Sequence, residues 1–207
     1  QYADYALRQR KWQHESAIQQ QLAYWQQQLS DAPALLQLPT DHPRPARATF
    51  QGQQQRLTLN IALSQQLRCL SQQSGTTLFM TMLTAFAILL SRLSGQEDIL
   101  IGSPIVNRNQ LELESLIGFF VNTLVLRIDL SGKPNVSDLL QQVRQTTLDA
   151  YTHQDITFEK LVAELQPERH LDRNPLFQVF FNMVNLPRQG LEIPGLTLTP
   201  VPVTNLP

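Results

Sequence analysis

Apolar side chains recur at helical spacing in three parts of the chain, which predicts an amphipathic helix in each. In residues 1–29 the apolar positions line one face and glutamine fills the other. Residues 135–151 and 158–165 show the same spacing. The apolar positions of the three parts are, in order, Ile18, Leu22, Trp25 and Leu29; Val136, Leu140, Val143 and Thr147; and Phe158, Leu161, Val162 and Leu165.

Two further helices are predicted in the middle of the chain. One begins near Ser64 and closes at Gly75, because serine favours the start of a helix and glycine the position after its end. The other runs from about Thr77 to a stop signal at Gly95 and is the most apolar run of the chain. Thr and Ser interrupt it and Arg92 lies near its end, which predicts a buried helix and not a membrane span.

Short apolar runs bounded by turn residues predict the strands. Three prolines in residues 38–53 forbid regular helix and predict a surface loop, and the proline-punctuated residues 191–203 predict a short edge strand or an arm. Strands and helices thus alternate, which argues for a mixed α/β layer structure with helices against a sheet. The predicted strands are 54–64, 97–106, 117–130 and 176–184.

Asn122 breaks the pattern of the third predicted strand. It falls on the face that also carries Phe120, Leu124 and Leu126. An amide buried without partners costs roughly 1–3 kcal/mol. Either a partner satisfies the Asn122 side chain, or this face opens onto a cleft.

Composition limits the classes of function. The chain has 207 residues, 42% of them hydrophobic and 16% charged, with a net charge of −1, which fits one large domain or two small ones. Without a basic block, nucleic acid and anionic membranes are not expected partners. The single cysteine, Cys69, lies in a leucine-rich helical pattern and is predicted to be a buried small hydrophobe. A lone cysteine fits a reducing compartment, and we expect a cytoplasmic protein.

Common catalytic and binding motifs are absent from the sequence. Its eight glycines form no phosphate-binding loop, its four histidines lack metal-ligand spacing, and no Gly-x-Ser-x-Gly elbow occurs. His153 and Asp155 could form a proton relay, but they precede a predicted helix for which Asp155 or Thr157 is a natural N-cap, and this structural interpretation is favoured. Arg108 follows a predicted strand, where an exposed surface arginine is expected.

Four stretches of the chain resemble, in order, the motif series of condensation domains from nonribosomal peptide synthetases. They are YADYALRQRKWQ (2–13), IGFFVNTLVLR (117–127), HQDITFEKLV (153–162) and RHLDRNPLFQVFF (169–181). The motif positions are Tyr2, Asp4, Trp12, Gly118, Phe120, Asn122, Thr123, Arg127, His153, Gln154, Asp155, Phe158, Glu159, Arg169, Arg173, Asn174, Pro175 and Leu176.

The resemblance implies a two-lobed fold like that of chloramphenicol acetyltransferase, with a mixed sheet packed against helices in each lobe. A donor held as a thioester on the 4'-phosphopantetheine arm of one carrier domain would meet the amine of an acceptor on a second carrier domain. No cofactor or metal would bind the domain directly. The expected partners are upstream and downstream peptidyl carrier domains, the N-terminal lobe and a neighbouring adenylation domain.

The family's active-site signature, two adjacent histidines followed after three residues by Asp-Gly, is absent from this sequence. Residues 1–207 are therefore expected to be a partial C-terminal lobe, with the N-terminal lobe and the last strands outside the chain. Because the second histidine of the signature acts on the attacking amine, the isolated piece is expected to be inactive. The apolar face toward the other lobe predicts self-association.

Two residues are assigned supporting catalytic roles through the resemblance. Asn122 either borders a wet substrate channel or bonds a neighbouring backbone group at an irregularity in the sheet. Arg108 is expected to pair with the signature aspartate, with Arg44 and Arg92 as rivals, and to be merely hydrated in the isolated lobe. His170 stands where the usual motif carries Asp.

The residues of these motifs resemble those of condensation domains that join an L-configured donor to an L-configured acceptor. Two alternatives stay open. One is a heterocyclization, epimerization or polyketide-associated sibling of the same superfamily. The other is a degenerate module of the same fold that binds carriers without catalysis.

Overall fold

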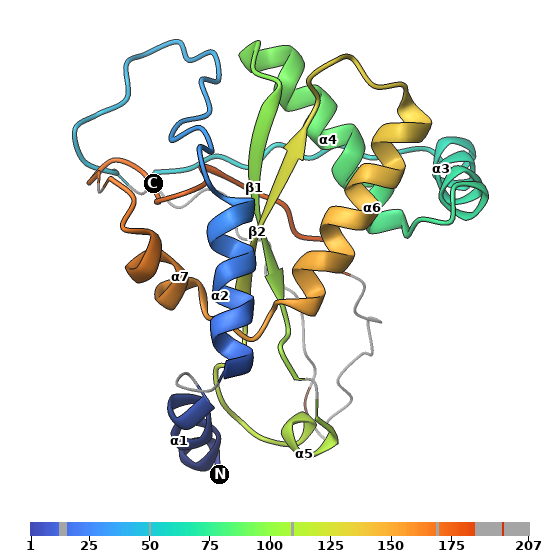
Figure 1. Cartoon of the computed structure of the whole chain (residues 1–207). Coiled ribbons are helices and arrows are strands. Elements are labelled where there is room, and N and C mark those ends of the chain that lie inside the picture. Colours follow the sequence, from blue (N-terminus) through green and yellow to red (C-terminus); the bar gives the residue numbers. More distant parts are fainter. Residues whose placement is uncertain (13–15, 50, 109, 169, 185–195, 197–207) are drawn as a thin grey trace.

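The computed structural model describes residues 1–207 except 13–15, 50, 109, 169, 185–195 and 197–207 (Figure 1). The described part is a mixed α/β fold, as predicted, but its helices and strands do not alternate strictly, because four helices precede the first strand. The helix predicted over residues 1–29 is described as two helices, Tyr2–Trp12 and Ser16–Gln28. The helices are α1 Tyr2–Trp12, α2 Ser16–Gln28, α3 Ile61–Gln73, α4 Leu78–Ser94, α5 Leu111–Glu114, α6 Val136–Thr152 and α7 Phe158–Leu165. The strands are β1 Asp98–Ile105, β2 Asn122–Asp129 and β3 Val179–Phe180.

The strands of the described residues form a mixed sheet in the order β2-β1-β3. Strands β1 and β2 are antiparallel, with Asp98 opposite Asp129 and Ile105 opposite Asn122. The short strand β3 runs parallel to β1. Helices α2 and α6 flank β2, and α7 lies beyond α2 (Figure 1). The fold is therefore the predicted mixed sheet packed against helices.

The core lies between the sheet and the helices. The apolar face predicted for α2 is buried, with Trp25 only 2% exposed. Leu140, Val143 and Thr147 of α6 are buried as predicted, whereas Val136, the first residue of that helix, is exposed. The other fully buried side chains come mainly from the sheet and from α4: Leu83, Thr84, Ile99, Ile101, Leu124, Val125, Leu126 and Ile128.

Helix α4 has the ends that its sequence predicts. The Thr77 hydroxyl accepts a hydrogen bond from the Met80 N–H, which caps the start of the helix. Gly95 takes a left-handed conformation, with φ of +72°, and ends it. In the described part of the chain no single helix has the length and apolar character to cross a membrane. Only α3 and α4 taken together pass that test, and they are bent by 106° relative to each other.

The strand predicted over residues 54–64 is wrong. Residues 51–60 have no regular structure, and α3 begins at Ile61 because the Asn60 side chain accepts a hydrogen bond from the Leu63 N–H at 2.8 Å. Leu57 is 84% exposed, so the apolar side chain of this segment does not pack against the core. A strand also needs a neighbouring strand for its backbone groups, and no described strand lies beside this segment.

The prediction that Cys69 is buried is also wrong, because Cys69 is exposed. Helix α3 packs through its opposite face, where the hydroxyl groups of Ser71 and Thr81 are 2.7 Å apart and both residues are buried. Two positions along a helix differ in direction by about 200°, so the burial of Ser71 turns Cys69 outward.

Two other predicted strands are shorter than expected. The strand predicted over residues 117–130 begins only at Asn122. Of residues 176–184, β3 contains only Val179 and Phe180, because Leu176 takes a positive φ of 68° and turns the chain before the sheet. Apart from Leu196, the edge strand or arm predicted over residues 191–203 lies outside the described residues.

Candidate functional site

The first two motif stretches meet in an aromatic cluster. The Tyr2 hydroxyl donates a hydrogen bond to the Phe119 carbonyl at 2.9 Å, and the Tyr2 ring lies edge-on to Phe120 at 5.2 Å between centroids. The ring of Tyr5 lies 4.7 Å from that of Phe120. Gly118 permits this contact, since a Cβ there would lie 2.3 Å from the Tyr2 ring. Helix α1 is thus attached directly to the segment before β2.

Arg108 is not simply hydrated, in contrast to the expectation. Its guanidinium carbon lies 4.2 Å from the centroid of the Phe120 ring. Its Nη1 donates to the carbonyl of Leu113 and, at 2.9 Å, to that of Leu116. It therefore satisfies carbonyls at and just after the end of α5, where a cation is favourable. Its Nε and Nη2 make no hydrogen bond to any described residue, so they could meet a carboxylate.

The rivals of Arg108 lie elsewhere. Arg44 donates through Nη1 to the carbonyl of Asp172 at 3.3 Å. Arg92 is exposed in the last turn of α4. Neither contacts the aromatic cluster in the described part of the chain, so of the three candidates it is Arg108 that lies against this cluster.

Asn122 is satisfied entirely by backbone groups of this chain. Its Nδ2 donates to the carbonyls of Gln154 at 2.9 Å and Ile156 at 2.8 Å. Its Oδ1 accepts from the N–H groups of Thr123 at 2.8 Å and Phe158 at 3.0 Å. The residue is 6% exposed. Because both donors and both lone pairs are occupied, Asn122 has no hydrogen-bonding capacity left for a substrate and acts by holding the 153–158 loop.

His153 and Asp155, in the loop between α6 and α7, do not form a relay. The His153 ring stacks on Tyr24 with centroids 3.9 Å apart, and its Nδ1 lies 2.7 Å from the Asp149 carbonyl oxygen. The His153 carbonyl accepts from Trp25 Nε1 at 2.8 Å. Burial, and to a smaller extent the Asp149 charge, raise the pKa of Tyr24 to about 12. The imidazole is therefore engaged with α2 and α6.

Asp155 faces α2 instead of His153. Its Oδ2 accepts from Gln21 Nε2 at 2.7 Å, and its backbone N–H donates to Gln21 Oε1 at 3.0 Å. Of the two N-cap candidates, Thr157 caps α7 by accepting from the Lys160 N–H. Glu159 is exposed in the first turn of α7, where a negative charge is favourable.

The fourth motif stretch joins the third through Phe177. Its ring lies 5.4 Å from that of Phe158 and covers Gly102, where a Cβ would be 2.3 Å from the ring. Gln178 fixes the neighbouring chain, since its Oε1 accepts from the Leu36 N–H at 2.8 Å and its Nε2 donates to the Asn174 carbonyl at 3.4 Å. Asn174, Pro175 and Leu176 thus form the turn that carries Phe177 to the sheet.

His170 and Arg173 of the fourth stretch line a pocket of about 340 Å³, together with the segment that follows α2. Arg173 Nη2 donates to His170 Nδ1 at 3.2 Å, and Arg173 Nε lies 3.4 Å from an oxygen of Asp172. His170 Nε2 faces Glu168 at 3.4 Å. Acceptance at Nδ1 places the proton of a neutral His170 on Nε2, toward that carboxylate. Arg169 lies outside the described residues.

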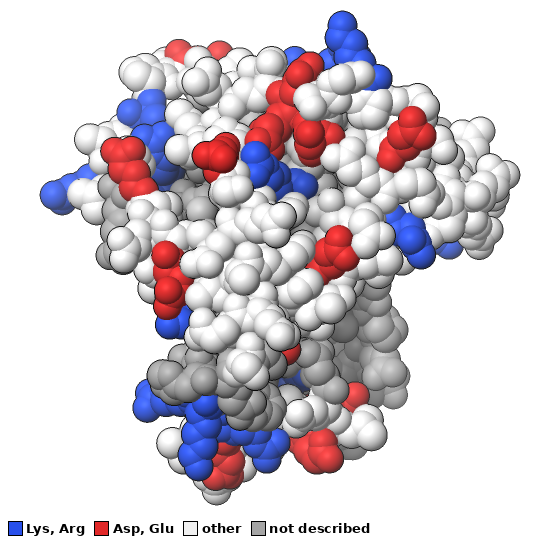
Figure 2. Space-filling view, in the orientation of Figure 1, with Lys and Arg blue, Asp and Glu red and all other residues white. Residues whose placement is uncertain are grey.

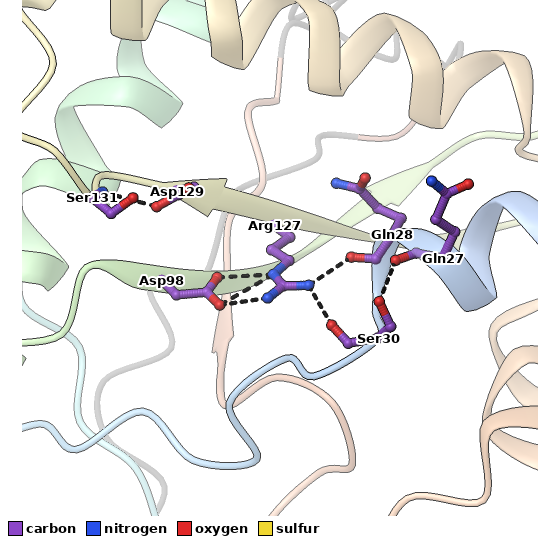
Figure 3. A network of polar contacts seen from close by, with 7 residues as sticks. All are labelled: Gln27, Gln28, Ser30, Asp98, Arg127, Asp129 and Ser131. Atoms are coloured by element: carbon purple, nitrogen blue, oxygen red, sulfur yellow. Dashed lines mark hydrogen bonds and ion pairs between the residues drawn. The ribbon is translucent and has the colours of Figure 1, made fainter.

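Arg127 stands at the other end of β2 (Figure 3). Its Nη2 forms an ion pair with Asp98 Oδ2 at 2.8 Å, and its Nε lies 3.0 Å from Oδ1. Its Nη1 donates to the carbonyls of Gln28 at 3.0 Å and Ser30 at 2.7 Å, at the end of α2. Hydrogen bonding to Asp98 raises the pKa of Arg127 further. Arg127 therefore joins β1, β2 and α2.

Charged side chains are unevenly spread over the face seen in Figure 2. Figure 2 shows basic side chains gathered at the lower end of the molecule, over α1, where Arg8, Arg10 and Lys11 lie. Among the described residues, no group of three histidine, cysteine or acidic side chains could hold a metal ion.

Sequence reasoning missed several residues of the site. Gln21, Tyr5 and Asp98 make contacts at its centre or edge, yet none belongs to the predicted set. Asp98 lay within a predicted strand opposite the one with Arg127, so opposite charges on paired strands were a usable signal. The glutamine-rich face of α2 concealed Gln21, because nothing in sequence separates it from its exposed neighbours.

The comparisons with known proteins give the family. The model of the Condensation domain family matches residues 1–198. The chain is 57% identical over 185 residues to part of a linear gramicidin synthase from Brevibacillus parabrevis, covering 89% of this chain and 4% of that protein. It is 52% identical over 200 residues to malpinin synthetase of Mortierella alpina, covering 97% and 3%.

Two solved structures share the fold. The crystal structure of the X-domain from teicoplanin biosynthesis has a TM-score of 0.82 at 28% identity, covering 87% of this chain and 41% of that one. The structure of a four-domain nonribosomal peptide synthetase bound to AMP and glycine has a TM-score of 0.79 at 30% identity, covering 80% and 13%. The chain belongs to the condensation domains of nonribosomal peptide synthetases and has their chloramphenicol-acetyltransferase-like fold. It spans a small part of the relatives it matches.

Proposed function

We propose that residues 1–207 are a partial C-terminal lobe of a condensation domain that forms amide bonds between carrier-bound substrates. The donor is an aminoacyl or peptidyl thioester, the acceptor is an aminoacyl thioester, and both are of L configuration. Peptidyl carrier domains on either side deliver the phosphopantetheine arms, and an adenylation domain adjoins. The family membership and the identity to synthetases of the same kind support this proposal.

One observation carries the proposal furthest: an apolar strip formed by Ile117, Phe119 and Val121 is exposed beside the motif residues. These side chains are 97%, 74% and 46% exposed, while Phe120 between them is 3% exposed and held by the aromatic cluster. The segment is anchored on one face and presents apolar groups on the other. A surface of this kind favours cover by another part of the protein. The N-terminal lobe, with the substrate channel between the lobes, fits that need.

The division of chemistry follows from the residues present. The amine of the acceptor attacks the thioester carbonyl, the C–N bond forms as the C–S bond breaks, and the thiolate leaves with the proton that the amine loses. In the proposed reaction, a histidine of the family's double-histidine signature acts on that proton, and this sequence contains no adjacent histidines. The chain's own part is structural: Asn122 holds a loop, and Nε and Nη2 of Arg108 meet the signature aspartate across the lobes.

A second candidate is a condensation-like module that binds partners without catalysis. The observation that favours it is the TM-score of 0.82 to the X-domain from teicoplanin biosynthesis, which has also been solved in complex with OxyB. The two candidates predict the same C-terminal lobe and differ in the N-terminal lobe. The form of the histidine signature in the parent protein therefore separates them.

The deciding experiment uses the parent condensation domain with both lobes and its two carrier domains loaded with defined substrates. Amide formation is followed by mass spectrometry in a single turnover, with L and D donors compared. Amide formed preferentially from the L donor, and abolished by alanine at the second signature histidine, supports the proposal. Absence of amide with both donors, while the carriers still bind, would establish the non-catalytic candidate.

A further inference from the structure

One face of α2 holds the 153–158 loop, which carries most of the third motif stretch. Gln21, Tyr24 and Trp25 are spaced three and four residues apart, so they share a face of the helix. Gln21 makes two hydrogen bonds with Asp155. Its Nε2 donates to the carboxylate at 2.7 Å, and its Oε1 accepts from the backbone N–H at 3.0 Å. Trp25, 2% exposed, donates to the His153 carbonyl at 2.8 Å. The loop is therefore bound to a helix that lies outside the four motif stretches.

Asn122 binds the same loop from the sheet. It engages the carbonyls of Gln154 and Ile156 and the N–H of Phe158, while Gln21 engages the N–H of Asp155 between them. Two side-chain amides from different elements thus bind successive backbone groups of the same loop. Because a loop without regular structure has no other fixed partners for these groups, the two amides together define its position.

The position of the loop bears on the apolar strip. Asn122 directly follows the strip in sequence and is tied to the loop by three hydrogen bonds. Asp155 is also close enough to Tyr5 to contribute, after burial and Tyr2, to raising the pKa of that phenol. The loop is therefore tied by hydrogen bonds to Asn122, the anchor that directly follows the strip.

We propose that Gln21 is a positioning residue: it fixes the 153–158 loop and, through Asn122, the apolar strip that borders the substrate channel. This proposal rests on the proposed function, because the strip borders a channel only in a catalytic two-lobed domain. Gln21 does not touch substrate. It acts through geometry, for which displacements of about 1 Å have large effects on rate.

The test exchanges the two partners. In the parent condensation domain, Gln21→Glu sets two carboxylates against each other, and Asp155→Asn keeps a hydrogen bond when its side-chain oxygen accepts from Gln21 Nε2. The double variant Gln21→Glu/Asp155→Asn restores the pattern, since the new amide can donate to the new carboxylate and the backbone N–H of the loop keeps its acceptor. Gln20→Glu is the matched control, because Gln20 is exposed on the same helix and its substitution makes the same change of charge.

Two readouts are taken on each variant, well below its Tm. We expect Gln21→Glu to lower kcat for amide formation about tenfold with KM for the acceptor carrier little changed, and the double variant to recover most of the rate. Asn122 binds the N–H groups of Phe158 and Thr123. We expect hydrogen exchange at these two groups to be faster in Gln21→Glu than in the unmodified domain. In the double variant we expect the exchange rates to return to those of the unmodified domain. Gln20→Glu is expected to match the unmodified domain in both readouts.

The outcomes separate this proposal from the proposed function. An unmodified domain that makes no amide contradicts the proposed function, and the exchange rates then overturn or support the positioning of the loop by themselves. Equal rates for Gln21→Glu and Gln20→Glu in an active domain would overturn the role of Gln21. A slow single variant that the exchange of partners fails to restore would also overturn it, because general destabilisation is not reversed by a second substitution at the paired site.

Discussion

The two ends of strand β2 carry polar residues that hold neighbouring segments in different ways. Asn122 at the start is neutral, 6% exposed and bonded four times to backbone groups. Arg127, near the other end, is charged, its side chain is 22% exposed, and it binds a carboxylate and two carbonyls (Figure 3). One strand therefore fixes two segments, one with an amide in the interior and one with an ion pair near solvent.

The difference follows from the environment at each end. A charge in the position of Asn122 would lose its hydration, and its neighbours there are peptide groups that a neutral amide can match as donor and acceptor. At the Arg127 end, water reaches the pair and the carbonyls at the end of α2 attract a cation. The same strand can use a charge where water is near and needs a neutral group where it is not.

The largest effect is expected from Asn122→Ala. The substitution leaves two carbonyls and two N–H groups without their partner in a nearly dry site, which we expect to lower the free energy of unfolding by about 3 kcal/mol. Urea unfolding of the chain, followed by circular dichroism, measures it. Asn122→Asp is the matched control for shape, and it should destabilise as well, since a carboxylate would face the carbonyls of Gln154 and Ile156. A loss below about 1 kcal/mol would show that the loop does not depend on this amide.

A smaller effect is expected from Arg127→Met. The variant keeps the aliphatic stem but removes the ion pair with Asp98 and the bonds to α2, and exposure weakens such a pair. We expect a loss of about 1–2 kcal/mol in the same unfolding measurement, given the two charge-assisted bonds to carbonyls. Arg127→Met/Asp98→Asn tests the assignment, because removing the unpaired charge should return part of the loss. A variant as unstable as Asn122→Ala would contradict the contrast between the two ends.

Salt should separate the two ends further. At 1 M NaCl the Debye length is about 3 Å, so the pair of Arg127 with Asp98 is screened, whereas the neutral bonds of Asn122 are not. The destabilisation by Arg127→Met is expected to shrink at high salt, and that by Asn122→Ala to stay the same. The measurement repeats both unfolding series at low and high salt. An equal response of the two variants would remove the electrostatic distinction.

The smallest effect concerns Tyr24, which lies on α2 between the two ends. Its pKa in the folded chain is about 12, above the ordinary value of 10.0, because burial disfavours the phenolate. A raised folded pKa contributes stability that is complete below pH 10 and is lost as pH rises toward 12. Tyr24→Phe keeps the ring on His153 and should remove part of this alkaline loss. Spectrophotometric titration of the phenolate, compared with this variant, gives the pKa directly.

Self-association is a separate expectation from the exposed strip. Ile117 and Phe119 are 97% and 74% exposed, so the isolated chain should associate as its concentration rises. Multi-angle light scattering of the chain and of Ile117→Ser/Phe119→Ser measures this. A monodisperse monomer for the original chain at high concentration would contradict the expectation.

Most of the helices and the strands β1 and β2 could be predicted from local patterns, and two of the failures have a common cause. Thr77 and Gly95 act on their own helix, so the ends of α4 were predictable without the rest of the chain. Residues 54–64 and Cys69 were mispredicted because their structure depends on neighbouring elements. A strand over 54–64 would need a strand edge that is missing from the described sheet. The exposure of Cys69 depends on which face of α3 packs against α4.

For the candidate site, sequence alone located part of the residues, and the tertiary structure decided which groups each of them contacts. The apolar alternation marked Asn122 as a buried amide needing partners, and the motif stretches marked His153, Asp155 and Arg108. Which groups they meet is a matter of long-range approach: Asn122 takes backbone groups some thirty residues away, and Asp155 takes Gln21 from α2. Periodicity is a local property of the chain and is readable in sequence. Hydrogen-bond partners are set by how distant elements pack, so only the folded structure shows them.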